Sequence, residues 1–109
     1  MTSSSVLDRL YAVIVSRRGG DTKASYSAKL LADGPEACAK KLGEEAIETA
    51  LAAVKGDRQA LAAESADLLY HLLVVWAAAG LKPEDVYAVL AAREGRSGIA
   101  EKESRDKRA

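Results

Sequence analysis

The segment from Leu68 to Ala79 constrains the fold most, because a helix formed by it is apolar on nearly every side. Its polar side chains are those of Tyr70 and His71, so such a helix has no polar face to turn toward water. Twelve residues are too few to cross a bilayer, which takes about 20. We therefore expect this helix to be buried on several sides, in part by a second copy of the chain. A helix buried within a monomer is the alternative.

The composition favours closely packed helices over a sheet. Apolar residues make up 49% of the 109 residues, yet Phe is absent and aromatic residues are 5%, so the core must be built mainly from Ala, Leu and Val. Sixteen basic and sixteen acidic residues cancel, which provides no general attraction to nucleic acid or to a membrane surface. We expect one all-α domain over residues 1–109.

The cysteine content and the N-terminus predict a reduced, cytosolic setting. Cys38 is the single cysteine, so no intrachain disulfide forms, and the sequence has no Cys/His cluster typical of a zinc site. Residues 1–5 are polar and lack the basic and then apolar pattern of a secretory signal.

Apolar periodicity and end signals predict four main helices. Ser5 and Asp8 resemble a capping box, Pro35 suits a first helical position, and Gly56 and Asp57 suit a helix end followed by a new N-cap. The expected bounds are about Ser5–Arg17, Pro35–Lys55, Arg58–Ala79 and Pro83–Arg93.

The remaining segments are predicted to be less regular. A loop with one or two helical turns is expected around Tyr26 to Leu31, stopped by Asp33 and Gly34. Residues 94–109 are charged and interrupted by Gly and Ser, so we expect a flexible tail that becomes ordered only with a ligand or partner.

Acidic residues stand at matching positions on the two central helices. If these helices form a hairpin that turns at Gly56, Glu48 and Glu64 are each eight residues from the turn, and Glu45 and Asp67 are each eleven. The carboxylates then lie level with each other, roughly 12 to 17 Å from the turn at 1.5 Å of rise per residue. Glu44 is four residues before Glu48 and can join them.

A bound cation is the expected reason for this acidic cluster, because gathered carboxylates repel one another and are costly to desolvate. Oxygen ligands without histidine or thiolate favour Mg²⁺, or Mn²⁺, over zinc. The alternative is an ordinary solvated face, in which Lys40 and Lys41 pair with Glu44 and Glu45 four residues later.

Two motifs resemble those of a known enzyme superfamily. The run KKLGEEAIE at 40–48 and the run ESADLLYH at 64–71 resemble the EExxE and ExxD motifs of the all-α, MazG-like NTP pyrophosphohydrolases. SYSAKLL at 25–31 and REGRSG at 93–98, followed by Glu101 and Lys102, make the chain similar to the phosphoribosyl-ATP pyrophosphohydrolase family. This resemblance covers nearly the whole chain.

The resemblance implies a four-helix, usually homodimeric fold that hydrolyses phosphoribosyl-ATP to phosphoribosyl-AMP and pyrophosphate with Mg²⁺. By hypothesis, catalytic carboxylates hold Mg²⁺, which clamps the triphosphate and lowers the pKa of a bound water. These carboxylates are Glu45, Glu48, Glu64 and Asp67. Glu44 is a fifth metal ligand, or instead orients Lys40 or accepts a hydrogen bond beside the ligands. The general base stays open among the carboxylates.

Candidate substrate contacts come from three segments, and each has a structural alternative. They are Ser25, Tyr26 and Lys29, then Lys40 and Lys41, and finally Arg93, Arg96, Ser97, Gly98 and Lys102. Tyr26 suits stacking on adenine or packing in the core. The last group suits a phosphoribosyl moiety or a solvated tail. Of Lys40 and Lys41, at least one is expected to reach a phosphate of the substrate, while the other forms an ion pair on the surface.

Three further residues and two rival functions complete the expectations. His71 is interpreted as a satisfied core or interface residue in preference to a partner of Asp67, Trp76 is assigned to packing, and Cys38 has no catalytic role. The rival functions are a house-cleaning pyrophosphatase for dUTP or damaged triphosphates, and a non-catalytic helical dimerisation module.

Overall fold

The computed structural model describes residues 3–95, 98, 102, 103 and 105, and the helices below account for most of them. Five α-helices follow one another, with no strand among the described residues, which confirms the all-α prediction. They are α1 (Ser3–Ser16), α2 (Tyr26–Asp33), α3 (Pro35–Lys55), α4 (Arg58–Ala79) and α5 (Pro83–Arg93).

Local end signals explain the central hairpin of α3 and α4. Pro35 begins α3, and Gly56 ends it in the left-handed region with a φ of 74°, which a residue without Cβ adopts at little cost. The Asp57 side chain then accepts a hydrogen bond of 3.0 Å from the Ala60 N–H and caps α4. The predicted bounds of both helices are confirmed.

The other helices show one confirmation and one error. The turns expected near Tyr26 form α2, which Ser25 caps by accepting a hydrogen bond of 3.1 Å from the Ala28 N–H. The capping box of Ser5 and Asp8 is wrong, because α1 begins at Ser3 and Ser5 lies inside it. Three consecutive serines precede Val6, and the local pattern does not choose among them.

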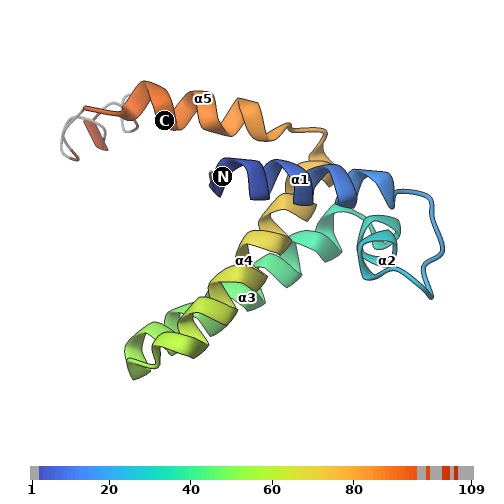
Figure 1. Ribbon diagram of the computed structural model, residues 1–109, viewed down its shortest axis with the longest axis horizontal. Coiled ribbons are helices and arrows are strands. Elements are labelled where there is room, and N and C mark those ends of the chain that lie inside the picture. The colour runs from blue at the N-terminus through green and yellow to red at the C-terminus, as the bar shows by residue number, and fades with distance from the viewer. Residues whose placement is uncertain (1–2, 96–97, 99–101, 104, 106–109) are drawn as a thin grey trace.

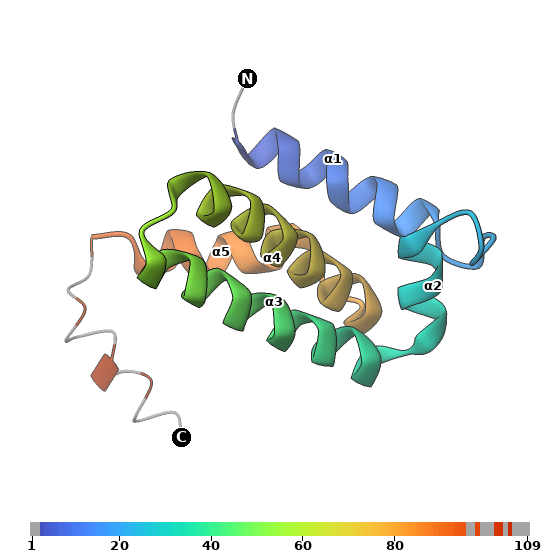
Figure 2. The ribbon, with the colours of Figure 1, turned by 90° about the horizontal axis from the view of Figure 1, so that it is seen from below.

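The core lies at one end of the hairpin. It joins Ile14 of α1 and Leu30 of α2 to Cys38 of α3 and to Leu73 and Val74 of α4. Its α4 residues come from the second half of that helix, so the first half and the Gly56 turn project beyond α1 (Figure 1). In the perpendicular view, α3 and α4 run side by side (Figure 2).

Helix α5 takes a different position from the other elements. It packs on α1, and Tyr87 donates a hydrogen bond of 3.1 Å to Asp8 while Tyr11 donates one of 2.9 Å to the Leu81 carbonyl (Figure 1). The α3–α4 hairpin therefore forms one layer, and α1 crosses this layer. Helix α5 packs on α1.

Helix α4 has the length and apolar content that could cross a membrane, with 22 residues and a mean hydropathy of 1.3. The core helix of a soluble protein meets the same criteria. In this structure His71, Leu73 and Val74 are buried against neighbouring helices, and Glu64 and Asp67 lie on its first half. These features are typical of a core helix.

Candidate functional site

Three carboxylates converge where α3 lies beside α4. Glu45 and Glu48 come from α3 and Glu64 from α4, and one oxygen of each lies within 4.8 Å of those of the other two. The predicted level placement of Glu48 and Glu64 is thus confirmed, and that of Glu45 and Asp67 stays a prediction. Asp67 is one turn further along α4, and its charge acts on both Glu45 and Glu64.

A threonine ties the two helices together at this level. The Thr49 hydroxyl lies 2.8 Å from the Glu45 carbonyl on its own helix and 3.1 Å from the Glu64 carbonyl on α4. The backbone carbonyls of two of the carboxylate residues therefore meet at one side chain. This contact sets the spacing of the helices where the acids converge.

Two oxygens of the carboxylate cluster lack hydrogen-bond partners in the described part of the chain. Glu45 Oε2 and Glu64 Oε2 are buried and have no hydrogen-bond partner. Burial first, and then the nearby carboxylates of Glu48 and Asp67, raise the pKa of both side chains above the ordinary value for Glu. When these carboxylates are ionised, a bound cation would offset their mutual electrostatic repulsion.

The donor set fits a hard divalent cation. Carboxylate oxygens alone converge, and the two buried oxygens without partners have lone pairs free for coordination. Glu45, Glu48 and Glu64 could therefore hold Mg²⁺ or Mn²⁺, whereas zinc favours nitrogen and sulfur ligands.

His71 faces this cluster from the buried side. Its side chain is only 6% exposed, its Nε2 lies 3.9 Å from Glu45 Oε1, and its Nδ1 is buried without a partner. Burial first, and then the charge of Lys41, lower the pKa of His71 and favour the neutral ring. The expected burial is confirmed, but the interpretation as a satisfied core residue is wrong for Nδ1.

Glu44 and the two lysines before it lie apart from the trio. Lys41 forms an ion pair of 3.4 Å with Glu44, which raises the pKa of Lys41. The expected spacing of four residues is wrong here, because the pair spans three. Lys40 is exposed. Glu44 is exposed and is not part of the close group of three, so its part in metal binding stays a prediction.

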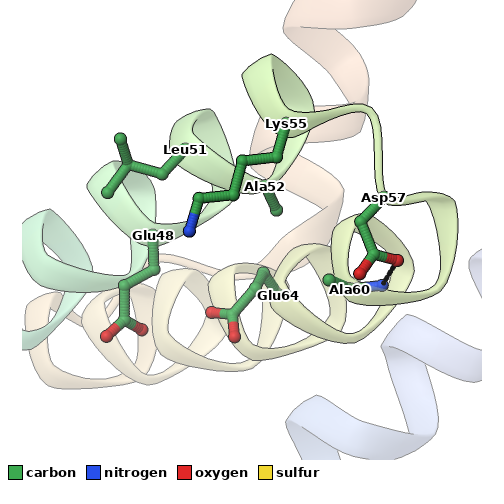
Figure 3. A pocket seen from close by; sticks show the side chains of 7 residues that line it. All are labelled: Glu48, Leu51, Ala52, Lys55, Asp57, Ala60 and Glu64. Carbon is green, nitrogen blue, oxygen red and sulfur yellow. Dashed lines mark hydrogen bonds between the residues drawn. The ribbon is translucent and has the colours of Figure 1, made fainter.

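A surface hollow of about 310 Å³ opens between the trio and the hairpin turn. The residues that line this hairpin hollow are Glu48, Leu51, Ala52, Lys55, Asp57, Ala60 and Glu64 (Figure 3). Figure 3 shows the Lys55 side chain extending from the end of α3 back over the hollow toward Glu48. Lys55 was not among the residues predicted from the sequence. The equal spacing of Lys41, Glu48 and Lys55 along α3 is the signal that could have identified it.

The candidates on α2 have local roles in the fold. Ser25 caps the helix, and Lys29 pairs with Asp33 at 3.1 Å. The Tyr26 ring is stacked on the Tyr70 ring, with centroids 6.2 Å apart, but Tyr26 remains 50% exposed. Half of its surface is therefore accessible to a ligand.

Among the C-terminal candidates, Arg93 is not brought to the carboxylates within this chain. Arg93 ends α5, which packs on α1, away from the hairpin hollow (Figure 1). Gly98 and Lys102 are described and exposed, whereas Arg96 and Ser97 lie outside the described residues. The expected tail therefore stays a prediction.

Comparisons with known proteins agree on one group. Residues 7–94 match the family model described as phosphoribosyl-ATP pyrophosphohydrolase. A phosphoribosyl-ATP pyrophosphatase of Azospirillum brasilense is 58% identical over 103 residues, covering 94% of this chain and 93% of that protein. One of Parvibaculum lavamentivorans is 59% identical over 105 residues, covering 96% of each chain. One of Gluconobacter oxydans is 55% identical over 102 residues, covering 94% of this chain and 77% of that protein.

Proposed function

Because this chain belongs to the phosphoribosyl-ATP pyrophosphohydrolase family, we propose that it hydrolyses phosphoribosyl-ATP to phosphoribosyl-AMP and pyrophosphate. This reaction is the second step of histidine biosynthesis. We assign this reaction to the hairpin because Glu45, Glu48 and Glu64 converge there. A site of oxygen ligands next to a hollow suits a substrate made of linked phosphates.

Magnesium is the cation that we propose for the trio. Two buried carboxylate oxygens without partners support this choice, as does the absence of nitrogen and sulfur from the close group of donors in the described residues. When bound, Mg²⁺ would supply positive charge to the triphosphate and to the departing pyrophosphate. Asp67 is one turn away and is proposed to complete the ligand set.

The side chains of the hairpin would then carry out the proton transfer and hold the substrate. A carboxylate of the site is proposed to accept a proton from the attacking water, and the general base stays open among the carboxylates. Lys40 and Lys41 begin a turn before the acids, and at least one of them is proposed to reach phosphate oxygens, while the other forms a surface ion pair.

The rest of the substrate is assigned to the flanking segments. The half-exposed Tyr26 ring is proposed to stack on adenine, with Ser25 and Lys29 beside it on the same helix start. The group Arg93, Arg96, Ser97, Gly98 and Lys102 is proposed to bind the phosphoribosyl moiety. Because α5 packs on α1 and does not lie at the hollow, contact of Arg93 with a substrate there requires a change of conformation or a second subunit.

A homodimer in the cytosol is part of the proposal. Ile47, Leu51 and Val54 are 64%, 53% and 85% exposed on α3, and Leu69 is 43% exposed on α4. Such a row of apolar side chains on a projecting hairpin favours burial against a second copy. The core at the other end of the hairpin leaves this row uncovered.

The test is pyrophosphate release from phosphoribosyl-ATP, ATP and dUTP with and without Mg²⁺. We expect selective release from phosphoribosyl-ATP that requires Mg²⁺ and falls at least 100-fold in Glu48→Gln, since ligand loss weakens metal binding and charge stabilisation. Glu36→Gln removes an exposed acid from the same helix and serves as the control. Equal activity on dUTP would favour the house-cleaning function, and full activity of Glu48→Gln would refute the site.

A further inference from the structure

Lysines stand on both sides of the carboxylate site along one line of α3. Lys41, Glu48 and Lys55 are seven residues apart, so each lies nearly above the previous one after two helical turns. Two turns correspond to about 10 Å along the axis. Glu48 is thus midway between two cations on the same flank of the helix.

The two lysines differ in their surroundings. Lys41 forms an ion pair with Glu44, whereas Lys55 leans back toward Glu48, because side chains of a helix lean toward its N-terminus. Figure 3 shows this orientation for Lys55, whose side chain extends from the end of α3 so that its ammonium group lies near Glu48. The long side chain therefore carries its charge back from the end of α3 to the carboxylate site.

The ammonium group of Lys55 has no counter-ion in the described part of the chain. Lys41 pairs with Glu44, but Lys55 forms no ion pair within 4.0 Å with Glu48, Asp57 or Glu64, although all four line the same hollow. A cation at the end of a helix is favourable beside the exposed carbonyls. Lys55 points the other way, so that role does not explain its position.

We propose that Lys55 binds phosphate oxygens of the departing pyrophosphate, an inference that rests on the proposed hydrolysis of phosphoribosyl-ATP. The hairpin hollow places this free ammonium group directly beside Glu48 and Glu64. A pyrophosphate held by a cation at the trio would present its outer oxygens to Lys55. Charge-assisted hydrogen bonds of this kind are among the stronger polar contacts.

The chemistry of the two ends of the site sets the direction of the substrate. The half-exposed ring of Tyr26 lies edge-on to the His71 ring, with centroids 5.9 Å apart, and His71 Nε2 is 3.9 Å from Glu45 Oε1. Tyr26 therefore lies on the Glu45 side of the trio, whereas Lys55 lines the hollow on the Glu48 side. The hairpin hollow contains aliphatic and charged side chains but no aromatic ring. A base stacks at the Tyr26 end, and the terminal phosphates therefore extend toward Lys55.

Equilibrium binding of inorganic pyrophosphate with Mg²⁺, measured by calorimetry, tests this role. We expect Lys55→Ala to weaken pyrophosphate binding about tenfold, as the loss of one hydrogen bond to a charged group predicts. Lys55→Arg retains the charge and should recover most of the affinity. Arg58→Ala removes an exposed cation at the same hairpin turn, outside the hollow, and should bind pyrophosphate as the unmodified protein does.

Phosphoribosyl-AMP provides the second measurement, because it shares the base and phosphoribosyl end but lacks the leaving group. Its affinity should be the same in Lys55→Ala and the unmodified protein. If Lys55 acted only through the overall positive charge, Lys55→Ala and Arg58→Ala would both weaken the binding of pyrophosphate and of phosphoribosyl-AMP to the same extent. Unchanged pyrophosphate binding in Lys55→Ala, or a larger loss for phosphoribosyl-AMP, would overturn the proposal.

Failure of the proposed function has a different signature. In that case the unmodified protein releases no pyrophosphate from phosphoribosyl-ATP, whatever residue stands at position 55. If the protein cleaves the substrate but Lys55→Ala binds pyrophosphate normally, only the Lys55 role is refuted. Unmodified protein that binds no pyrophosphate with Mg²⁺ refutes the Lys55 role as well. Thermal unfolding without metal verifies that each variant is folded.

Discussion

The Thr49 hydroxyl lies 3.1 Å from the Glu64 carbonyl, so one side chain joins α3 to α4 at the level of the carboxylate trio. The same oxygen is 2.8 Å from the Glu45 carbonyl. Both neighbours of this hydroxyl are thus residues of the proposed metal site. The contact is part-buried and links the spacing of the helices to the spacing of the ligands.

Thr49→Val tests this link, since the replacement keeps the shape and removes the hydroxyl. We expect unfolding to require about 1 kcal/mol less free energy, the usual net value of one hydrogen bond, and Mg²⁺ affinity to fall. Urea unfolding and Mg²⁺ titration measure the two effects. Thr49→Ser keeps the hydroxyl and should keep the metal affinity; equal Mg²⁺ binding by the valine and serine variants would show that the contact does not position the ligands.

Removal of one buried acid should stabilise the protein without metal. The pKa of Glu64 is raised in the folded state by burial and by Glu48, so its protonated form is favoured there. Its contribution to stability is therefore full below the unfolded pKa near 4.5 and is lost as pH rises through the higher folded value. At pH 7 in EDTA, Glu64→Gln should unfold at a higher temperature than the unmodified protein.

The pH dependence of stability tests whether the Glu64 charge causes the higher unfolding temperature of Glu64→Gln. The difference in stability between Glu64→Gln and the unmodified protein should shrink as pH falls toward 4.5, because the carboxyl becomes neutral in both states. Comparing the two proteins removes the contributions of groups that do not interact with Glu64, including His71. A difference that grows on acidification would contradict the cause assigned to the raised pKa.

Magnesium should stabilise the folded chain through the trio. At a Mg²⁺ concentration of 100 times Kd, binding to the folded state alone adds about 2.7 kcal/mol. Differential scanning calorimetry should show a higher Tm with Mg²⁺ for the unmodified protein and Glu36→Gln, and a much smaller increase for Glu48→Gln. Equal increases in all three would place the cation elsewhere.

Two glycines, one inside α3 and one at its C-terminal end, should respond in opposite directions to replacement by alanine. Gly56 has a φ of 74°, so Gly56→Ala should lower stability by about 1 kcal/mol although no atom lies within 4 Å of the added Cβ. Gly43 is inside the helix and is also unobstructed, so Gly43→Ala should raise stability by about 1 kcal/mol. Chemical denaturation of both variants without metal measures the effects; a change of the same sign in both would contradict the backbone explanation.

The exposed apolar row on α3 predicts association. Val54→Asp places a charge where 85% of the side chain is exposed, so it costs little in a monomer and much in a buried interface. Sedimentation should show that the unmodified protein and Val54→Leu are dimers and that Val54→Asp is a monomer. A monomeric unmodified protein would refute the dimer.

Residues near each other in the sequence determined much of the fold. Pro35, Gly56 and Asp57 set the ends of α3 and α4, because these residues act through their own φ angle or through a cap within three residues. The matching distances of Glu48 and Glu64 from Gly56 then predicted that the acids lie level. The start of α1 could not be predicted, because adjacent serines offer equivalent caps.

The sequence by itself determined α3, α4 and α5 with their lengths, and the level of Glu48 and Glu64 along the hairpin, since these follow from local backbone preferences and a constant rise per residue. Only the tertiary structure decided which acids converge, because that depends on the rotation of each helix about its axis. The Thr49 contact and the burial of Ala52 set this rotation for α3. They bring Glu45, Glu48 and Glu64 together, leave Glu44 with Lys41, and place Lys55 over the hollow.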